Sequence, residues 1–283
     1  MTAALQADPL SMLKGGDPDR YLATLYAPED KRRDLASLYA FNLEIARIRD
    51  LIRDPLPGEI RLQWWRDALD GSDPGAAADL PVAAEMARIM ADHHLPQAML
   101  QRYFEARIFD LYDDPMPSLN DLEGWCGETA GTILQFAALI LDRDAAIAAG
   151  GEAAGHGACA QAMAGLIRLL PLHRARGQCF VPADMLAACG LTRDEFLDGP
   201  ERGKAKAVVD ALVSAARDHH ALFVKAAASL PQTTRPAFLP LAPVPHYLRL
   251  AERAGADALT ATSVTSALRR NWLALRCAMR GFR

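Results

Sequence analysis

The chain has 283 residues, of which 51% are hydrophobic, and its formal net charge is −4 at pH 7. This length suits one large globular domain or at most two ordinary ones, and the near-neutral charge gives no argument for a nucleic-acid partner. The five cysteines are odd in number, scattered and without a Cys-x-x-Cys pair, which favours a reducing compartment, the cytoplasm by default.

Apolar residues recur at helical spacing along nearly the whole chain, whereas strand-type alternation is nearly absent, so the sequence predicts an all-α protein. Asp17 followed by Pro18 is typical of a helix N-terminus. The next such signal, at Pro28, predicts a long helix that continues to about Leu51.

The residues Pro55, Pro57 and Gly58 predict a break, which a helix carrying Leu62 and Leu69 follows. A loop of small residues is expected over 71–79. Further helices are predicted over residues 82–92, 96–111, 121–141, 154–170, 183–189, 204–229, 235–254 and 261–280. The three prolines within 236–245 predict a kink or an interruption of one of them.

No charge tract or low-complexity linker divides the chain, so we expect a flexible N-terminus over residues 1–16 and one domain over residues 17–283. Residues 1–16 lack the basic start and the apolar run of a secretory signal. The longest charge-free apolar stretch, Thr129 to Leu141, is too short to span a bilayer.

Four groups of residues resemble the squalene/phytoene synthase family, in the expected order. They are Asp19-Arg20-Tyr21-Leu22-Ala23 to Tyr39-Ala40-Phe41, Trp125-Cys126 to Ala130-Gly131-Thr132, Arg168, and Arg176-Gly177-Gln178-Cys179-Phe180-Val181-Pro182. The resemblance covers roughly residues 17–270. It implies an all-α, single-domain isoprenoid synthase fold, similar to terpenoid synthases, with helices around a central apolar pocket.

The enzymes of this family condense two prenyl diphosphates head to head, and the resemblance implies two Asp-x-x-x-Asp motifs that hold Mg²⁺. The first motif falls on Ala46 to Asp50 and the second on Leu169 to His173, so three of four expected carboxylates are missing. Asp50 is the residual candidate for a metal ligand. Pro171 is a further departure, because proline inside a helix removes a backbone donor and clashes with the preceding turn.

A diphosphate leaves only when its charge is neutralised, and each close unit-charge contact is worth roughly 4 kcal/mol at an effective dielectric constant near 20. Because about 1.4 kcal/mol is a factor of ten in rate, losing three carboxylates removes many orders of magnitude. We therefore expect a catalytically degenerate protein, a pseudoenzyme, with no metal cofactor and no catalytic role at Ala46, Asp50, Leu169 and His173.

Arginines gather in both motif regions, and guanidinium groups bind phosphate bidentately without a metal. The candidates for an anion or diphosphate site are Arg47, Arg49, Arg168, Arg174 and Arg176. Acids such as Glu44 and Asp54 are interleaved with the first group, so weak surface ion pairs are the alternative interpretation. The candidates for lining an isoprenoid-sized pocket are Tyr21, Tyr39, Phe41, Trp65 and Trp125, and ordinary core packing is their alternative.

The remaining histidines and cysteines give weaker signals. The adjacent residues His219 and His220 point about 100° apart on a helix, which is poor geometry for sharing one metal ion. His173 beside two arginines is expected to be structural, and Cys126 and Cys179 are expected to be packing residues.

One branch of the family fits the missing carboxylates better than the enzymes do. The strings Phe41-Asn42-Leu43-Glu44-Ile45-Ala46, Arg61-Leu62-Gln63-Trp64-Trp65 and Phe180-Val181-Pro182 are similar to those of the mitochondrial complex I assembly factor 6 group. This resemblance implies a protein that helps to assemble the respiratory NADH dehydrogenase by binding complex I subunits or other assembly factors. We expect it in the cytoplasm, peripheral on the cytoplasmic face of the inner membrane.

Two alternatives stay open. One is a Mg²⁺-dependent head-to-head prenyl transferase of isoprenoid biosynthesis, acting on farnesyl or geranylgeranyl diphosphate, with the metal held by Asp50, Glu44 or Glu128. The other is a metal-independent protein that binds prenyl or lipid phosphates through its arginines alone.

The last predicted helix has a basic stripe beside an apolar face. The stripe consists of Arg269, Arg276, Arg280 and Arg283, and the apolar residues are Leu268, Trp272, Leu275 and Met279. Such a face can make peripheral contact with anionic lipid, and a solvated helix edge is the alternative.

Overall fold

The computed structural model describes residues 8–72, 75, 80–112, 114 and 116–282, and these residues form helices and turns but no strand. The all-α class predicted from the sequence is therefore confirmed. Two compact units can be distinguished. Unit 1 is the chain up to Tyr112 together with Thr132–Gly151 and Leu230–Pro240, and unit 2 comprises residues 114–131, Glu152–Ser229 and the chain from Leu241 onward.

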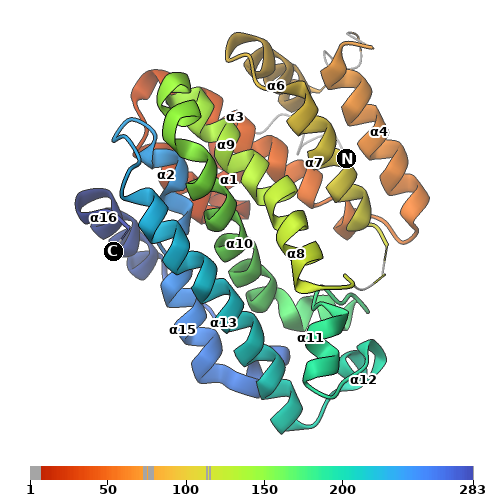
Figure 1. The fold of residues 1–283 in the computed structure, drawn as a ribbon. Helices are drawn as coiled ribbons and strands as arrows, with labels where there is room; N and C mark the ends of the chain where they lie inside the picture. The colour runs from red at the N-terminus through yellow and green to blue at the C-terminus, as the bar shows by residue number, and fades with distance from the viewer. Residues whose placement is uncertain (1–7, 73–74, 76–79, 113, 115, 283) are drawn as a thin grey trace. The chain divides into compact units, whose positions relative to one another are not determined.

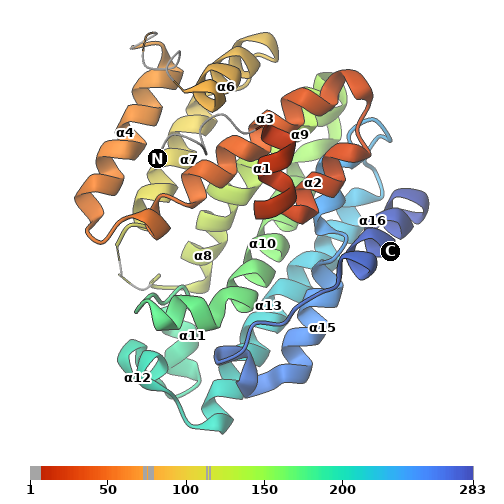
Figure 2. The same cartoon turned by 180° about the vertical axis from the view of Figure 1, so that it is seen from behind.

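Unit 1 is built around α3, which packs against α1, α2, α6 and α9 (Figures 1 and 2). Its helices are α1 (Pro9–Gly16), α2 (Pro18–Leu25), α3 (Glu29–Ala46), η2 (Arg49–Leu51), α4 (Pro55–Asp70), α6 (Pro81–Asp92), α7 (Gln97–Phe109), α9 (Thr132–Leu141) and α14 (Arg235–Phe238). The buried ring of Phe41 lies 5.4 Å from Trp65 and 5.8 Å from Tyr103, centroid to centroid, so α3, α4 and α7 share an aromatic core.

Local sequence explains where the first helices begin. The Asp17 side chain accepts a hydrogen bond from the Arg20 N–H at 3.1 Å, and Pro18 occupies the first position of α2, as predicted. Part of the segment expected to be flexible is helical, because Asp8 caps α1 and Leu13 is fully buried. Residues 1–7 lie outside the described residues.

Some predicted helix boundaries differ from the structure near prolines. The break expected at Pro55 comes earlier, because Pro55 lies in the first turn of α4, where a missing N–H costs nothing. That helix ends at Asp70 and is followed by Gly71, whose φ of +86° suits glycine. Most of the predicted loop 71–79 lies outside the described residues. The interruption expected within 236–245 is confirmed, since α14, η4 (Leu239–Leu241) and α15 (Val244–Ala254) replace one helix.

The largest difference is α10 (Arg143–Ala175), which extends the predicted helix 154–170 at both ends. It continues through Pro171, which lacks the N–H that an α-helix bonds to the carbonyl four residues earlier. The predicted helix 121–141 is also divided. It consists of α8 (Leu119–Cys126), a π-helical turn (Gly127–Gly131) and α9.

Unit 2 is built around α13, which packs against α11, α15 and η5. Its elements are α8, residues 152–175 of α10, α11 (Ala183–Ala188), α12 (Arg193–Asp198), α13 (Arg202–Ala227), α15 (Val244–Ala254), η5 (Gly255–Leu259) and α16 (Ala267–Arg280). A Cβ added to Gly157 on α10 would lie 3.0 Å from Leu241 and 3.2 Å from Phe223, so glycine permits close packing there.

Within the part of the chain that the structure describes, no helix combines the length and the apolar character needed to cross a bilayer.

Candidate functional site

The first motif position lies in unit 1, at the end of α3. The helix stops at Ala46, and the following amides of Ile48, Asp50 and Leu51 each bond to the carbonyl three residues earlier. In a 3-10 helix, which has three residues per turn, side chains four positions apart point about 120° away from each other. In an α-helix the same two side chains differ by only about 40°. Position 46 and Asp50, both exposed, therefore do not share a face as an Asp-x-x-x-Asp pair requires.

The second motif position lies in unit 2, on α10. Leu169 is 41% exposed, and the ring of His173 packs against Phe180 at 4.8 Å. Phe180 in turn lies 5.9 Å from Trp125 of α8. The position of the second aspartate is thus occupied by an imidazole at the end of an aromatic row.

The four motif positions do not fit Mg²⁺. This hard cation takes oxygen ligands, and the side chains here are a methyl group, one carboxylate, an isobutyl group and an imidazole. Among the residues that the structure describes, no group of three or more His, Cys, Asp or Glu side chains is arranged to hold a metal ion.

Each of the three guanidinium nitrogens of Arg174 on α10 donates a hydrogen bond to a backbone carbonyl. Nε donates to the carbonyl of Phe196 at 2.9 Å, Nη2 to that of Leu197 at 3.0 Å, and Nη1 to that of Leu259 at 3.1 Å. Burial lowers the pKa of Arg174 from its usual value. These contacts join α10 to the end of α12 and to η5, and they use three of the five N–H donors of the guanidinium group.

The other predicted anion ligands have varied environments. The Arg168 guanidinium lies 4.1 Å from the ring centroid of Tyr247, in a cation–π contact between α10 and α15. Arg47 and Arg176 are exposed, and Arg49 is half-buried. Their role in binding an anion stays a prediction.

The predicted pocket residues of unit 1 are mostly packed. Tyr39, Phe41 and Trp65 are at most 5% exposed, and Tyr21 is half-buried. The Tyr39 hydroxyl is buried and has no hydrogen-bond partner within the described residues, and burial raises the pKa of Tyr39. Trp125, in unit 2, is half-buried in the aromatic row described above.

A buried polar network lies beside these rings. Tyr103 donates its hydroxyl hydrogen to Asn42 Oδ1 at 3.1 Å, and Arg107 approaches the same oxygen at 3.4 Å. Arg107 also pairs with Asp110 at 2.9 Å. Burial raises the pKa of Tyr103, which keeps its hydroxyl protonated as the donor.

A contact that the sequence did not suggest joins three helices of unit 2. His219 of α13 lies 3.1 Å from Glu123 of α8 through Nε2 and 3.1 Å from His156 of α10 through Nδ1. Nearby, a hydrogen bond with Cys159 and burial raise the pKa of the Cys126 thiol. These partners are too distant in sequence for any local pattern to connect them.

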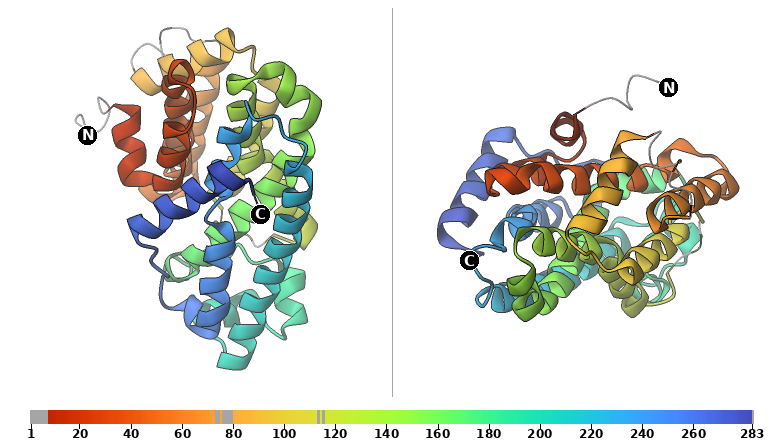
Figure 3. Two further views of the ribbon diagram at one scale, coloured as in Figure 1. Left: turned by 90° about the vertical axis from the view of Figure 1, so that its left-hand side faces the viewer. Right: turned by 90° about the horizontal axis from the view of Figure 1, so that it is seen from above.

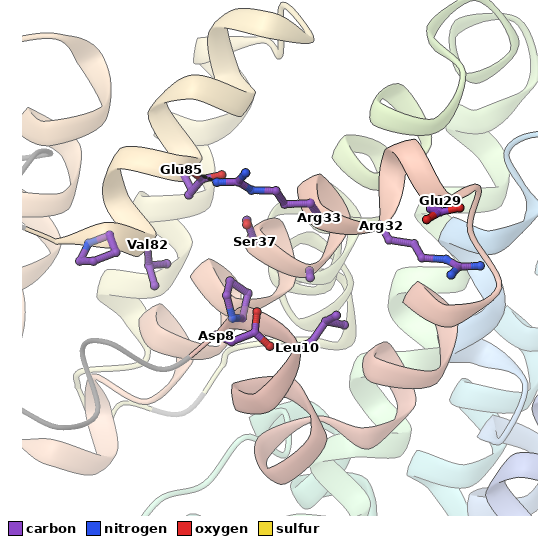
Figure 4. Close-up of a pocket in the computed structure, with 11 residues that line it drawn as sticks. Asp8, Leu10, Glu29, Arg32, Arg33, Ser37, Val82 and Glu85 are labelled. Carbon is purple, nitrogen blue, oxygen red and sulfur yellow. Dashed lines mark hydrogen bonds and ion pairs between the residues drawn. The ribbon is translucent and has the colours of Figure 1, made fainter.

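A pocket of about 750 Å³ in unit 1 was also not expected from the sequence. α1, α3 and α6 line it, and Figure 4 shows Arg33 of α3 extending toward Glu85 of α6. Their side chains form an ion pair at 2.7 Å. None of the predicted pocket residues named above belongs to its lining.

The described residues form an all-helical protein whose four metal-motif positions keep one carboxylate. The sequence model described as squalene/phytoene synthase matches residues 13–272. The chain belongs to the squalene/phytoene synthase family, as predicted.

Two curated relatives carry the same name. The protein is 29% identical over 252 residues to "NADH dehydrogenase (ubiquinone) complex I, assembly factor 6" of Mus musculus, covering 88% of this chain and 74% of the mouse protein. It is 27% identical to the Homo sapiens protein of that name over the same number of residues, with the same coverage.

Solved structures confirm the fold. The squalene synthase HpnC from Alicyclobacillus acidocaldarius has a TM-score of 0.71 at 18% identity, over 90% of this chain and 97% of that one. A dehydrosqualene synthase has a TM-score of 0.74 at 16% identity, over 96% of each chain.

Proposed function

We propose that this chain acts by binding, in the assembly of the respiratory NADH dehydrogenase (complex I), and not by prenyl transfer. The observation that carries this proposal is the state of the first motif, where α3 ends at Ala46 and Asp50 follows in a tighter turn. A metal cage would need both a new carboxylate and a different backbone there.

The relatives supply the particular process. Proteins named complex I assembly factor 6 resemble this chain over 88% of its length, which supports the assembly role by homology. Fold alone does not establish function, because the solved structures that share this fold include synthases. We propose complex I subunits or other assembly factors as partners, and a location in the cytoplasm at the inner face of the membrane.

The cellular test is deletion of the gene in a host whose respiratory chain contains this NADH dehydrogenase. We expect less assembled complex on native gels and lower NADH–ubiquinone activity. Complementation sharpens the test, because Asp50→Asn removes the residual metal candidate. If binding is the function, this variant restores the complex as well as the unchanged gene does. Normal assembly and activity in the deletion strain would refute the assembly role.

The biochemical test is incubation of the purified protein with farnesyl or geranylgeranyl diphosphate and Mg²⁺, beside a working squalene synthase as control. We propose that no metal cofactor is used, and therefore expect no release of diphosphate above background. Turnover that Asp50→Asn abolishes would assign the chain to the prenyl transferases. Retention of the diphosphate without Mg²⁺, weakened in Arg168→Ala, would indicate the anion-binding alternative.

A further inference from the structure

The last helix, α16, has apolar side chains on two opposite faces. Leu273, Ala274 and Cys277 form the inner face and are buried. Phe282, just beyond the helix, packs edge-on against Phe223 of α13 at 5.0 Å. The inner face therefore packs α16 against the rest of the protein, and its buried residues are the ones that folding requires to be apolar.

The outer face carries a second apolar row that folding does not explain. Leu268, Trp272, Leu275 and Met279 are 82%, 47%, 45% and 67% exposed. Their spacing of four, three and four residues places them within an arc of about 60° on the helix. A single exposed leucine is ordinary, but a continuous row on one helix indicates a contact surface. Figure 3 shows α16 at an angle to α15, near the C-terminus.

The charges of α16 are all of one sign. The helix contains four arginines and no acidic residue. Arg269, Arg276 and Arg280 lie along one flank of the apolar row, about 90° from its centre. The guanidinium groups of Arg269 and Arg276 lie 5.1 and 5.5 Å from the centroid of the Trp272 ring. The indole is therefore held between two cations at the edge of the row.

The neighbouring helix α15 extends this basic flank. Burial and the positive charges of Arg269, Arg249 and Arg253 lower the pKa of His246, so these three arginines add to one positive region. Both α15 arginines are exposed. The acid between them, Glu252, forms an ion pair with Arg217 of α13 at 2.6 Å.

We propose that α16 is a docking element for an anionic lipid surface. The row Leu268, Trp272, Leu275 and Met279 enters the boundary between headgroups and acyl chains, and the arginine flank contacts the lipid phosphates. This inference does not depend on the role in complex I assembly, because it follows from the row and its charges alone.

The charges of α16 favour a lipid surface over a second copy of this chain as the partner of the apolar row. A second copy packed row to row would bring two helices of four arginines each together, and like charges at such a distance repel. An exposed row along the convex surface of a helix suits a deformable lipid surface, and a tryptophan beside cationic side chains is typical of the membrane interface. An acidic protein remains as an outcome of the test.

The experiment uses the full-length protein and sedimentation with vesicles. One set contains phosphatidylcholine with one third phosphatidylglycerol, and the other contains phosphatidylcholine only. We expect capture by the anionic set alone, decreasing as salt is raised, because surface charge attraction is screened. Since each arginine near an anionic surface strengthens binding roughly fivefold, Arg269→Gln/Arg276→Gln should weaken capture about 25-fold.

Matched variants distinguish binding through the α16 row and its arginines from a general effect of removing any exposed leucine or arginine. Leu268→Ser/Trp272→Ser should lose most of the capture, whereas Leu222→Ser, which replaces an exposed leucine on α13, should keep it. Arg33→Gln/Arg202→Gln removes the same charge at exposed positions elsewhere and should change capture less than twofold.

The fluorescence of Trp272 also tests whether its side chain enters the lipid. Brominated lipid in the anionic vesicles should quench part of the tryptophan fluorescence, and Trp272→Phe should remove that part. Absence of capture by anionic vesicles, equal capture by both sets, or capture that the α16 variants leave unchanged would overturn the proposal. A dimer that Leu268→Ser/Trp272→Ser abolishes, or an acidic protein that binds this row without vesicle capture, would reassign the row and equally overturn it.

Discussion

Replacing Arg174 by alanine removes three hydrogen bonds to backbone carbonyls at once. The carbonyls of Phe196, Leu197 and Leu259 would then lose their charged donor between α10, α12 and η5. Hydrogen bonds from charged groups contribute about 1.5–3 kcal/mol each when buried, and water replaces part of this at a half-buried site. We take about 1 kcal/mol for each, so Arg174→Ala should destabilise the fold by about 3 kcal/mol.

The assay is urea unfolding followed by circular dichroism, together with a thermal melt. A loss of about 3 kcal/mol corresponds to a fall in Tm of roughly 6–12 °C for a chain somewhat shorter than this one, so the lower part of that range is expected. Arg174→Lys keeps the charge but not the fork of donors, and should recover only part of the loss. Arg176→Ala, at an exposed position two residues later, should change stability by less than about 0.5 kcal/mol.

The result distinguishes structural from ligand-binding roles for Arg174. If Arg174→Ala left the unfolding free energy unchanged within about 0.5 kcal/mol, the three bonds would not stabilise the fold as we infer. If it also weakened the binding of a prenyl diphosphate, Arg174 would be an anion ligand, as the sequence suggested.

Three further predictions concern other contacts. Burial opposes ionisation of Asp34, but hydrogen bonds from His93 and Arg88 lower its pKa overall. The stability that the ionised Asp34 contributes is therefore present above a pH of about 4 and is lost as the pH falls further. Asp34→Asn should make the unfolding free energy less dependent on acid pH and should cost about 1 kcal/mol at neutral pH, a small value because solvent screens the pair. Tyr103→Phe should cost about 1–2 kcal/mol in urea unfolding because Asn42 Oδ1 would keep only the longer contact with Arg107, whereas Tyr39→Phe should be neutral or stabilising. The reverse order of the two effects would contradict the network. Gly157→Val should lower stability by about 1–3 kcal/mol through overpacking, and an unchanged Tm would show that the neighbouring side chains yield freely.

Much of the fold was predictable because local signals and tertiary packing agree. Asp17 and Pro18 start α2 through a cap and a fixed φ, which need no distant partner. The periodic apolar residues of α3 likewise pointed to one buried face. The helix ends were less predictable, because α10 contains glycines that disfavour helix, and packing of buried residues such as Ala153 overrides that preference.

At the candidate site, the sequence predicted the missing carboxylates but not the contacts that the remaining side chains make. The missing carboxylates can be read directly from the residue types at 46, 169 and 173. The three carbonyl partners of Arg174 and the contact between Glu123 and His219 come from segments distant in sequence, which no local spacing connects. The tightened turn after Ala46 also has no clear signal, because Arg47 to Leu51 would continue a helix on propensity alone.

That tightened turn makes the loss of the first motif hard to reverse by evolution. One substitution at position 46 would return an acidic group, but on a different side of the chain from Asp50. Restoring two carboxylates on one face would therefore require an acidic residue at position 46 together with a different backbone between residues 47 and 51.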